Sequence, residues 1–406
     1  MNVGFYYHVE AVFEPDGAAR VPALLGMFIE QLASSAGRVT FYAHGESRAG
    51  IEDYRLTEPL VRCVNLGPRA SFPERLFVPS RSLRAFRPQG DGLDVMLVRG
   101  PSALLPGIVA ASRDIPTALH IVGDYSDQKR DPKARDMPWW RDRAIRAAFK
   151  VYSRRQRRAA RDALVLVNAL QLAERFAGHP HVEVVFESTL TEAMLASSPR
   201  TGAPGLGRAR PARLLCTGRL IPEKGLWEAV EALRLLVARG WHAELDVVGW
   251  EAPGDPVVGN LREHARALGV FERVHFRGYV PAGSQLADVY READIFVLAS
   301  HGDAEGFPRS IFEAMGTGMP VVTTPVGGVP YWIRDGEQAL LVDPRSAESL
   351  ASGIERLLVD DSLRAHVAET GLEFSRDWTI EKGCELLADK LSDWSERARR
   401  SQSSRA

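Results

Sequence analysis

Short apolar runs alternate with amphipathic stretches along most of the chain, and this alternation restricts the fold more than any other feature. Strands that are apolar along most of their length are typical of parallel sheets covered by helices on both faces. The segment 2–7 (NVGFYY) is such a run. The segment 225–239 has helical periodicity, with Val230 and Leu233 on one stripe and Gly240 at its end. The alternation therefore predicts an α/β protein.

The chain of 406 residues is long enough for two domains of ordinary size. Residues 197–212 are rich in Pro, Gly, Ser and Arg and lack apolar periodicity, so we expect an interdomain linker there. The expected domains span 1–196 and 213–378, each a doubly wound, Rossmann-like α/β unit, and they face each other across a cleft. Residues 379–406 are expected to form a helix that packs back on the N-terminal domain, followed by a disordered tail.

Twelve apolar runs are expected to be strands: 2–7, 38–43, 94–98, 117–122, 163–167, 182–186, 213–217, 244–248, 273–277, 295–299, 320–324 and 339–342. Helical patterns cover 19–34 and 140–160. In such sheets, ligands bind beyond the carboxyl ends of the strands, where helix N-termini point. We therefore look for chemistry in the turns that follow the strands.

The overall composition excludes several classes of protein. A net charge of −1 gives no general basic field, so nucleic acid is not an expected partner. The three cysteines, Cys63, Cys216 and Cys384, are too far apart for a zinc site or a disulfide framework. The N-terminal residues do not form a signal peptide, and no run of 18 apolar residues exists, so a cytoplasmic protein is expected.

The turn CTGRLIPEKG, 216–225, follows an expected strand and opens a helix. Arg219 and Lys224 would flank the helix N-terminus. Two cations beside free backbone N–H groups form a site for a diphosphate, because they neutralise the charge that grows on a departing phosphate. A solvated loop that carries two basic residues is an equally good interpretation of this turn taken alone.

The segment EGFPRSIFEAM follows the expected strand 295–299. Glu305 precedes a Gly-Phe-Pro turn, Pro308 suits a first helical turn, and Glu313 lies inside the helix. For isolated carboxylates, a solvated loop acid and a helix-stabilising acid are the usual interpretations. A third turn, TPVGGVPYWI at 324–333, brings two glycines that let the backbone approach a ligand closely. Three neighbouring turns favour one common site.

These elements together resemble a known family. Glu305, seven residues and Glu313, followed by AMGTGMPVVTTPVGG, are similar to the E-x7-E signature of retaining GT-B glycosyltransferases of family 4, also called glycosyl transferases group 1. GRLIPEKG, VHFRGYV at 274–280 and FSRDW at 374–378 resemble further elements of that group. The resemblance covers about 213–378, in order and with the usual spacing, and it implies a GT-B fold.

The resemblance also implies roles for individual residues. Arg219 and Lys224 would hold the nucleotide diphosphate and stabilise it as it leaves. Glu305 would bind hydroxyls of the donor sugar, and Glu313 would accept hydrogen bonds from the ribose hydroxyls. Further nucleotide-sugar contacts are implied at the helix start and at two strand ends: Gly306, Phe307, Pro308 and Arg309, then Arg277 and Tyr279, and Gly218.

The N-terminal half matches the family less well. His120 lies at the end of an apolar strand, where the family has a histidine that faces the donor sugar, so it joins Arg219, Lys224 and Glu305 as a catalytic candidate. A packed core histidine is the alternative. Of the family's Gly-Gly turn only Gly17 remains, as a candidate contact to the donor. This departure favours acceptor recognition by the first loop.

The expected function is transfer of a sugar from a nucleotide diphosphate donor, with retention of configuration and with no metal or other cofactor. A UDP-sugar is favoured over a GDP-sugar, and the acceptor is a glycan, a lipid-linked molecule or a small molecule. A nucleotide-sugar epimerase of the same fold and a non-catalytic nucleotide-sugar-binding subunit are the alternatives. A dinucleotide oxidoreductase fits poorly, because no GxGxxG follows the first strand of either half.

The segment 139–162 is strongly basic and begins with Trp139 and Trp140. A solvated helix face is the favoured interpretation of this pattern. The alternative is peripheral contact with the inner face of an anionic membrane or with a lipid-linked acceptor.

Overall fold

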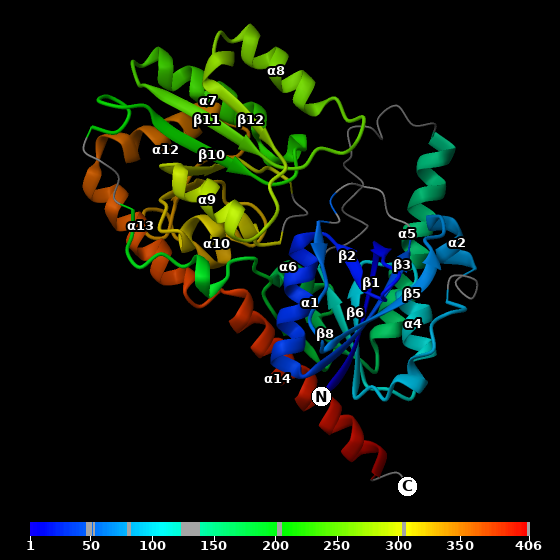
Figure 1. Ribbon diagram of the computed structural model, residues 1–406. Coiled ribbons are helices and arrows are strands. Elements are labelled where there is room, and N and C mark those ends of the chain that lie inside the picture. Colours follow the sequence, from blue (N-terminus) through cyan, green and yellow to red (C-terminus); the bar gives the residue numbers. More distant parts are fainter. Residues whose placement is uncertain are drawn as a thin grey trace. The chain divides into compact units, whose positions relative to one another are not determined.

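The computed structural model describes residues 1–45, 51, 53–78, 83–122, 139–200, 205–302 and 306–403. The chain divides into two compact units (Figure 1). Unit 1 comprises Met1–Phe186 together with Glu381–Ala406, and unit 2 comprises Glu187–Ile380. Both units have α/β architecture, as the alternation of apolar and amphipathic segments predicts.

In unit 1 a mainly parallel sheet has the central order β5-β3-β1-β6-β7-β8-β9, and the short strands β2 and β4 extend it in antiparallel fashion from β1. Its strands are β1 (Asn2–Phe13), β2 (Ala19–Val21), β3 (Arg38–Gly45), β4 (Tyr54–Arg55), β5 (Val61–Pro68), β6 (Val95–Gly100), β7 (Thr117–Ile121), β8 (Leu164–Val167) and β9 (Val182–Val184). Its helices are α1 (Ala23–Ala36), α2 (Phe72–Phe77), α4 (Leu105–Ala111), α5 (Trp139–Ala160), α6 (Leu170–Glu174) and α14 (Ile380–Ser403).

In unit 2 the sheet is parallel, with the order β12-β11-β10-β13-β14-β15 in the described residues. Its strands are β10 (Ala212–Thr217), β11 (Ala243–Val248), β12 (Val274–Gly278), β13 (Ile295–Leu298), β14 (Val321–Thr323) and β15 (Leu340–Leu341). Its helices are α7 (Leu226–Ala238), α8 (Val257–Ala267), α9 (Ser284–Glu292), α10 (Arg309–Gly316), α11 (Val329–Trp332), α12 (Ala347–Val359) and α13 (Asp361–Ser375).

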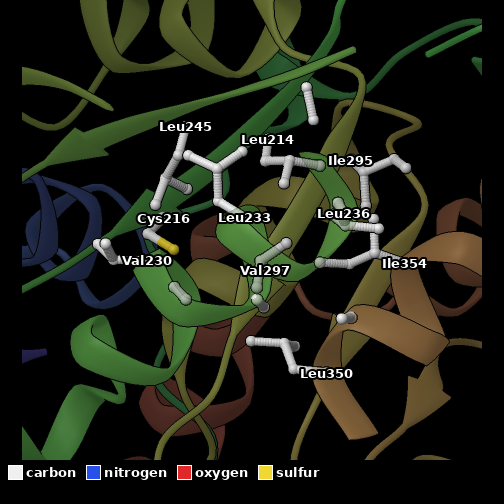
Figure 2. Close-up of a cluster of buried hydrophobic side chains, with 14 of the residues drawn as sticks. Leu214, Cys216, Val230, Leu233, Leu236, Leu245, Ile295, Val297, Leu350 and Ile354 are labelled. Carbon is white, nitrogen blue, oxygen red and sulfur yellow. The ribbon is translucent and has the colours of Figure 1, made fainter. Parts of the chain in front are cut away.

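Alternate residues of β10 show how helices cover both faces of the unit 2 sheet. Leu214 and Cys216 face α7 and α12 in one apolar cluster (Figure 2). Leu215, on the opposite face, packs with residues of α9 and α10. The central residues of a strand that is buried on both faces are apolar on both, which is why Leu214, Leu215 and Cys216 form an unbroken apolar run.

Each of the twelve predicted strands overlaps an observed strand, but the structure also contains β2, β4 and β5, which the sequence pattern did not predict. The prediction of a helix over 19–34 was wrong at its start. Residues 19–21 form β2 and pair with β1, and the helix begins after Pro22. A proline has no N–H to give to a helix interior, so it is tolerated only near the helix start.

The structure also corrects the predicted linker 197–212, because the unit boundary falls at Phe186 and the chain from Glu187 onward belongs to unit 2. Leu206 is buried in the main core of unit 2, and the Arg200 N–H donates to the Gly318 carbonyl at 2.8 Å. Arg210 forms two hydrogen bonds to Asp294, of 2.6 and 2.9 Å. These contacts fix the segment on the unit 2 sheet despite its Pro- and Gly-rich composition.

Helix α14 belongs to unit 1, where residues 379–406 were expected to pack. The Cys384 thiol lies 3.9 Å from the Phe28 carbonyl oxygen of α1, and the His181 ring contacts Trp394 at 4.9 Å between centroids. An ion pair joins Lys390 to Glu183. The helix therefore returns the chain to the domain in which it began.

Candidate functional site

In unit 2, three turns follow the carboxyl ends of the adjacent strands β10, β13 and β14. Backbone hydrogen bonds join these turns to one another. The His301 N–H donates to the Glu223 carbonyl at 2.9 Å, and the Gly328 N–H donates to the Gly306 carbonyl at 3.1 Å. The three sequence motifs are therefore brought together at one edge of the sheet, as their positions predicted.

Two glycines explain how the turns approach so closely. A Cβ on Gly225 would lie 2.0 Å from the Ala299 carbonyl oxygen, and one on Gly249 would lie 1.7 Å from the Gly218 oxygen. Gly225 also has a φ of 71°, which disfavours other residues. Only glycine allows the backbone of the β10 turn to touch the turns of both neighbouring strands.

The first of these turns contains the expected diphosphate residues. Gly218, with a φ of 140°, and Arg219 are exposed, and Lys224 is half-buried at the end of the turn, directly before α7. The position of a Cβ on Gly218 would be 3.9 Å from the Lys224 side chain. Both cations therefore lie in one short turn beside the start of a helix, where backbone N–H groups and positive charge favour an anion.

The second turn leads into α10. Glu305 lies outside the described residues, whereas Gly306 to Arg309 are described. Pro308 is the N-cap and Arg309 the first helical residue, so the helix starts one residue later than the sequence suggested. The Phe307 ring stacks on Phe312 with 4.3 Å between centroids, which holds the turn against the helix.

Glu313 is nearly fully buried, and its carboxylate is oriented by two hydroxyl groups. Tyr290 of α9 donates to its Oε2 at 2.6 Å, and Thr189 donates to its Oε1. Thr217, the last residue of β10, in turn lies 2.6 Å from the Tyr290 hydroxyl. Burial, and then the Glu313 carboxylate, raise the pKa of Tyr290 well above its usual range, so this hydroxyl keeps its proton and donates it.

The sequence alone did not find Tyr290, Thr189 or Thr217. Thr189 and Glu313 are 124 residues apart, and Thr189 fell inside the expected N-terminal domain. Tyr290 had one available signal, since a tyrosine on the buried stripe of a helix needs a partner for its hydroxyl. A carboxylate with one hydrogen bond to each oxygen retains lone pairs that can accept bonds from a ligand.

Arg277 and Tyr279 lie at the end of β12, next to β11. The Arg277 guanidinium binds Glu292 at 2.8 Å and lies 3.6 Å from Asp246. Tyr279 is exposed. The Arg277 side chain is thus engaged by acids, and the backbone beside it remains the expected point of contact with a base.

The two N-terminal candidates belong to unit 1. His120 is 1% exposed in β7, and its Cα partner across the pair with β6 is Arg99. Gly17 is exposed, with a φ of 87°, in the turn between β1 and β2, where its N–H donates to the Glu14 carbonyl. A tight hairpin turn accounts for this glycine without any ligand.

Helix α5 carries the basic segment. Its second half packs into unit 1 through Tyr152, Gln156 and Ala160, while Trp139 and Trp140 at its start are 77% and 59% exposed. No helix within the described ranges is both long and apolar enough to cross a membrane. The described residues also contain no group of three or more His, Cys, Asp or Glu side chains arranged to hold a metal ion.

Comparison with known proteins shows a family match within unit 2. Residues 206–374 match the family model described as "Glycosyl transferases group 1". Most of unit 2 is thus similar in sequence to group 1 glycosyltransferases. The matched region includes the three turns and also Glu313, Tyr290 and Thr217. Thr189 lies outside it.

Relatives align over part of their length. The chain is 35% identical over 178 residues to D-inositol 3-phosphate glycosyltransferase of Corynebacterium glutamicum, covering 43% of this chain and 42% of the relative. It is 34% identical over 182 residues to the lipopolysaccharide core biosynthesis glycosyltransferase LpsE of Rhizobium meliloti, covering 44% and 50%. The chain thus spans about half the length or less of these two relatives.

A solved structure supports the fold of the whole chain. Anabaena HepE, in complex with UDP and glucose, matches with a TM-score of 0.70 at 18% identity, over 97% of this chain and 100% of that chain. The lipopolysaccharide biosynthesis glycosyltransferase WaaG matches with a TM-score of 0.66 at 16% identity, over 96% and 99%. The predicted GT-B fold class, with two α/β domains, is confirmed.

Proposed function

We propose that this protein transfers a sugar from a nucleotide diphosphate donor to an acceptor, as a retaining glycosyltransferase. The observation that carries the proposal is the convergence of turn residues 218–225, 299–302, 306–308 and 324–328 at one edge of the unit 2 sheet. At the end of β10, Thr217 is linked through Tyr290 to the buried carboxylate of Glu313. A UDP-sugar is the favoured donor. HepE has been solved with UDP and glucose, whereas one relative of this chain, from Mycobacterium tuberculosis, is described as GDP-mannose-dependent.

The geometry of unit 2 suggests how the donor is held. Arg219 and Lys224 bind the diphosphate, and Glu313, oriented by Tyr290, accepts hydrogen bonds from the ribose hydroxyls. Backbone amides of Gly306 and Phe307 line the sugar and phosphate. Backbone beside Arg277 and Tyr279 meets the base. Glu305 is assigned to the sugar hydroxyls.

In the chemical step, the bond between the sugar C1 and the diphosphate oxygen breaks, and the acceptor hydroxyl oxygen bonds to C1 from the same face. The proton of that hydroxyl passes to the departing diphosphate oxygen. Arg219 and Lys224 stabilise the charge that develops on the leaving diphosphate, which lowers the barrier without a metal ion. His120 is assigned to the sugar side of the reaction. The acceptor is a glycan, a lipid-linked molecule or a small molecule, and a cytoplasmic location with peripheral membrane contact is compatible with the exposed tryptophans of α5.

The proposal is tested with substitutions in the donor site. A thermal-shift panel of UDP-, GDP-, ADP- and dTDP-sugars identifies the donor, because a ligand that binds only the folded state raises its stability. Transfer is then followed as release of the nucleoside diphosphate with candidate acceptors. We expect Lys224→Ala and Glu305→Ala each to lower kcat/KM at least tenfold, while Arg291→Ala, at an exposed pair with Asp288 on α9, stays at the wild-type rate.

Wild-type rates in both donor-site variants would contradict the proposal. Conversion of the donor to a new nucleotide sugar without any acceptor would instead indicate the epimerase. Donor binding with no nucleotide release for any acceptor would indicate a non-catalytic subunit.

A ribose-specific test addresses Glu313. We expect Glu313→Gln to weaken UDP binding about tenfold, because a hydrogen bond to a charged group contributes about 1.5–3 kcal/mol. Binding of the 2′,3′-dideoxy analogue, which lacks both hydroxyls, should be unchanged. Glu263→Gln, at an exposed position of α8, is the matched control. An equal loss for both nucleotides would show that Glu313 does not contact the ribose.

A further inference from the structure

Basic side chains gather towards the carboxyl ends of neighbouring strands in unit 1. His44, the penultimate residue of β3, is in register with Glu10 of β1, and Arg99 of β6 is in register with His120 of β7. His8 lies on β1 where the register with β3 shifts. Because these strands are parallel and adjacent, their carboxyl ends lie along one edge of the sheet (Figure 1).

These groups are buried to an unusual degree for charged residues. Arg75, on α2, is 5% exposed, Arg99 is 7% exposed and His44 is fully buried. Lysine and arginine are rarely buried this deeply. The Arg99 guanidinium lies over the Tyr7 ring at 4.9 Å, and the Tyr7 ring in turn contacts His8 edge-on at 5.0 Å. Tyr7 therefore packs against both Arg99 and His8.

The local field is positive. Burial, followed by the charges of Arg75, Arg69, His44 and Arg99, lowers the pKa of His8 to about 3. The His8 Nδ1 is buried and has no hydrogen-bond partner in the part of the chain that the structure describes. Glu10, whose carboxylate lies 3.8 Å from Arg69, is a nearby acid that offsets part of this charge on the more exposed side.

This arrangement suits one class of ligand. Guanidinium groups bind phosphate oxygens through paired hydrogen bonds, and a phosphate has enough oxygens to engage donors from several strands together. A buried imidazole nitrogen close to arginines gains a favourable partner when an anion enters. A phosphate would also lower the field that holds His8 neutral.

We propose that Arg75, Arg99 and His8 form a phosphate-binding subsite in unit 1. Arg69 lies at its more exposed side. Resting on the proposed function, the subsite binds a phosphate monoester or diester of the sugar acceptor, and it orients the acceptor next to His120, which is in register with Arg99.

Calorimetric titration of the full chain with inorganic phosphate tests the subsite. Saturating UDP is present so that the donor diphosphate site is occupied, and ionic strength is constant. We expect wild type and Arg113→Gln to bind phosphate equally, since Arg113 is 83% exposed at the opposite end of β7. In Arg99→Gln and Arg69→Gln the dissociation constant for phosphate should rise about tenfold.

Arg99 is buried, so Arg99→Gln could prevent the protein from folding. Arg69→Gln then still tests the subsite, because the Arg69 side chain is 37% exposed and its replacement leaves the core intact. No phosphate binding by the wild type, or equal binding by wild type and Arg69→Gln, would overturn the subsite. Failure of the proposed function is a separate result, namely no binding of any nucleoside diphosphate sugar. In that event the phosphate titration is repeated without UDP in the Arg219→Ala, Lys224→Ala double variant.

Two further titrations distinguish the source of the phosphate. Competition between glycerol phosphate and inorganic phosphate, lost in Arg69→Gln, identifies a soluble acceptor. Co-sedimentation with phosphatidylinositol vesicles but not with phosphatidylcholine vesicles, also lost in Arg69→Gln, identifies a lipid headgroup. If Arg69→Gln changes neither the competition by glycerol phosphate nor the co-sedimentation with phosphatidylinositol vesicles, the assignment of the subsite to the acceptor is overturned.

Discussion

At the scale of single residues, the Tyr290 hydroxyl links Thr217 at the end of β10 to the Glu313 carboxylate. Tyr290→Phe leaves both partners buried without this hydrogen bond, which costs about 1–3 kcal/mol for an unsatisfied buried polar group. We expect urea unfolding to show a loss in that range and UDP binding to weaken. Tyr331→Phe, at a 50% exposed tyrosine, should leave the free energy of unfolding unchanged. An unaltered free energy of unfolding would contradict the role given to Tyr290.

His8 predicts a dependence of stability on pH. Its pKa is lowered to about 3 in the folded protein, against an ordinary value of 6.5, so below pH 6.5 the unfolded chain binds the proton more readily. Stability from this residue is therefore present above pH 6.5 and lost as the pH falls toward 3. At pH 5 the loss is about 2 kcal/mol, at 1.36 kcal/mol for each pH unit below 6.5.

In His8→Gln this contribution is absent, so we expect the melting temperature to fall less between pH 7 and pH 5 than in the wild type. His275→Gln, at a 45% exposed histidine of unit 2, is the control and should follow the wild type. Parallel curves for wild type and His8→Gln would show that His8 is not held neutral by its surroundings.

At the scale of elements, the turn between β10 and α7 depends on Gly225. Its φ is 71°, and a Cβ there would meet the Ala299 carbonyl at 2.0 Å. Gly240, just after α7, has a φ of 84° but nothing within 4 Å of its Cβ position. Gly240→Ala should cost about 1 kcal/mol from backbone strain alone. Gly225→Ala should cost more and also weaken donor binding, as measured by urea unfolding and calorimetry. Equal costs would show that the close approach is unimportant.

The FSRDW segment, residues 374–378, also has a structural role. The Trp378 ring stacks on Phe312 of α10 with 5.1 Å between centroids and an interplanar angle of 16°. Phe374 contacts both rings, with its centroid 6.2 Å from that of Phe312 and 5.4 Å from that of Trp378. The segment therefore supports the helix that carries Glu313, which explains why it accompanies the E-x7-E motif although it lies far along the chain.

The sequence predicted helices and strands better than it predicted contacts between distant side chains. Strands buried on both faces, such as β10 and β13, are continuous apolar runs and were found for that reason. Strand β5 (VRCVNLGP) is half-exposed and lacks a clear pattern, and β2 is too short to show one. The positions of the three turns that we propose to bind the donor could be predicted from the parallel sheet. The contact between Thr189 and Glu313 could not be predicted, because no local sequence pattern indicates a contact between side chains 124 residues apart.

At the scale of the whole molecule, the unit boundary makes a prediction. Residues 187–212 bury Leu190 and Leu206 and supply Thr189 to Glu313, so unit 2 begins well before the first strand of its sheet. We expect a fragment of residues 187–380 to fold cooperatively. A fragment of residues 213–378 should be less stable by several kcal/mol, since burying one leucine alone is worth about 2–5 kcal/mol. Equal melting temperatures for the two fragments would favour the shorter domain predicted from composition.

The central claim is that the turns of unit 2 bind the diphosphate of a nucleotide sugar. Calorimetric titration of UDP and GDP into the full chain tests it most directly, with Arg219→Ala and Lys224→Ala as site variants and Arg291→Ala as the control. We predict that the wild type and the control bind one of the two nucleotides equally, and that each site variant binds it at least tenfold more weakly. The claim would be contradicted if both site variants bound the nucleotide as strongly as the wild type does, or if the wild type bound neither nucleotide.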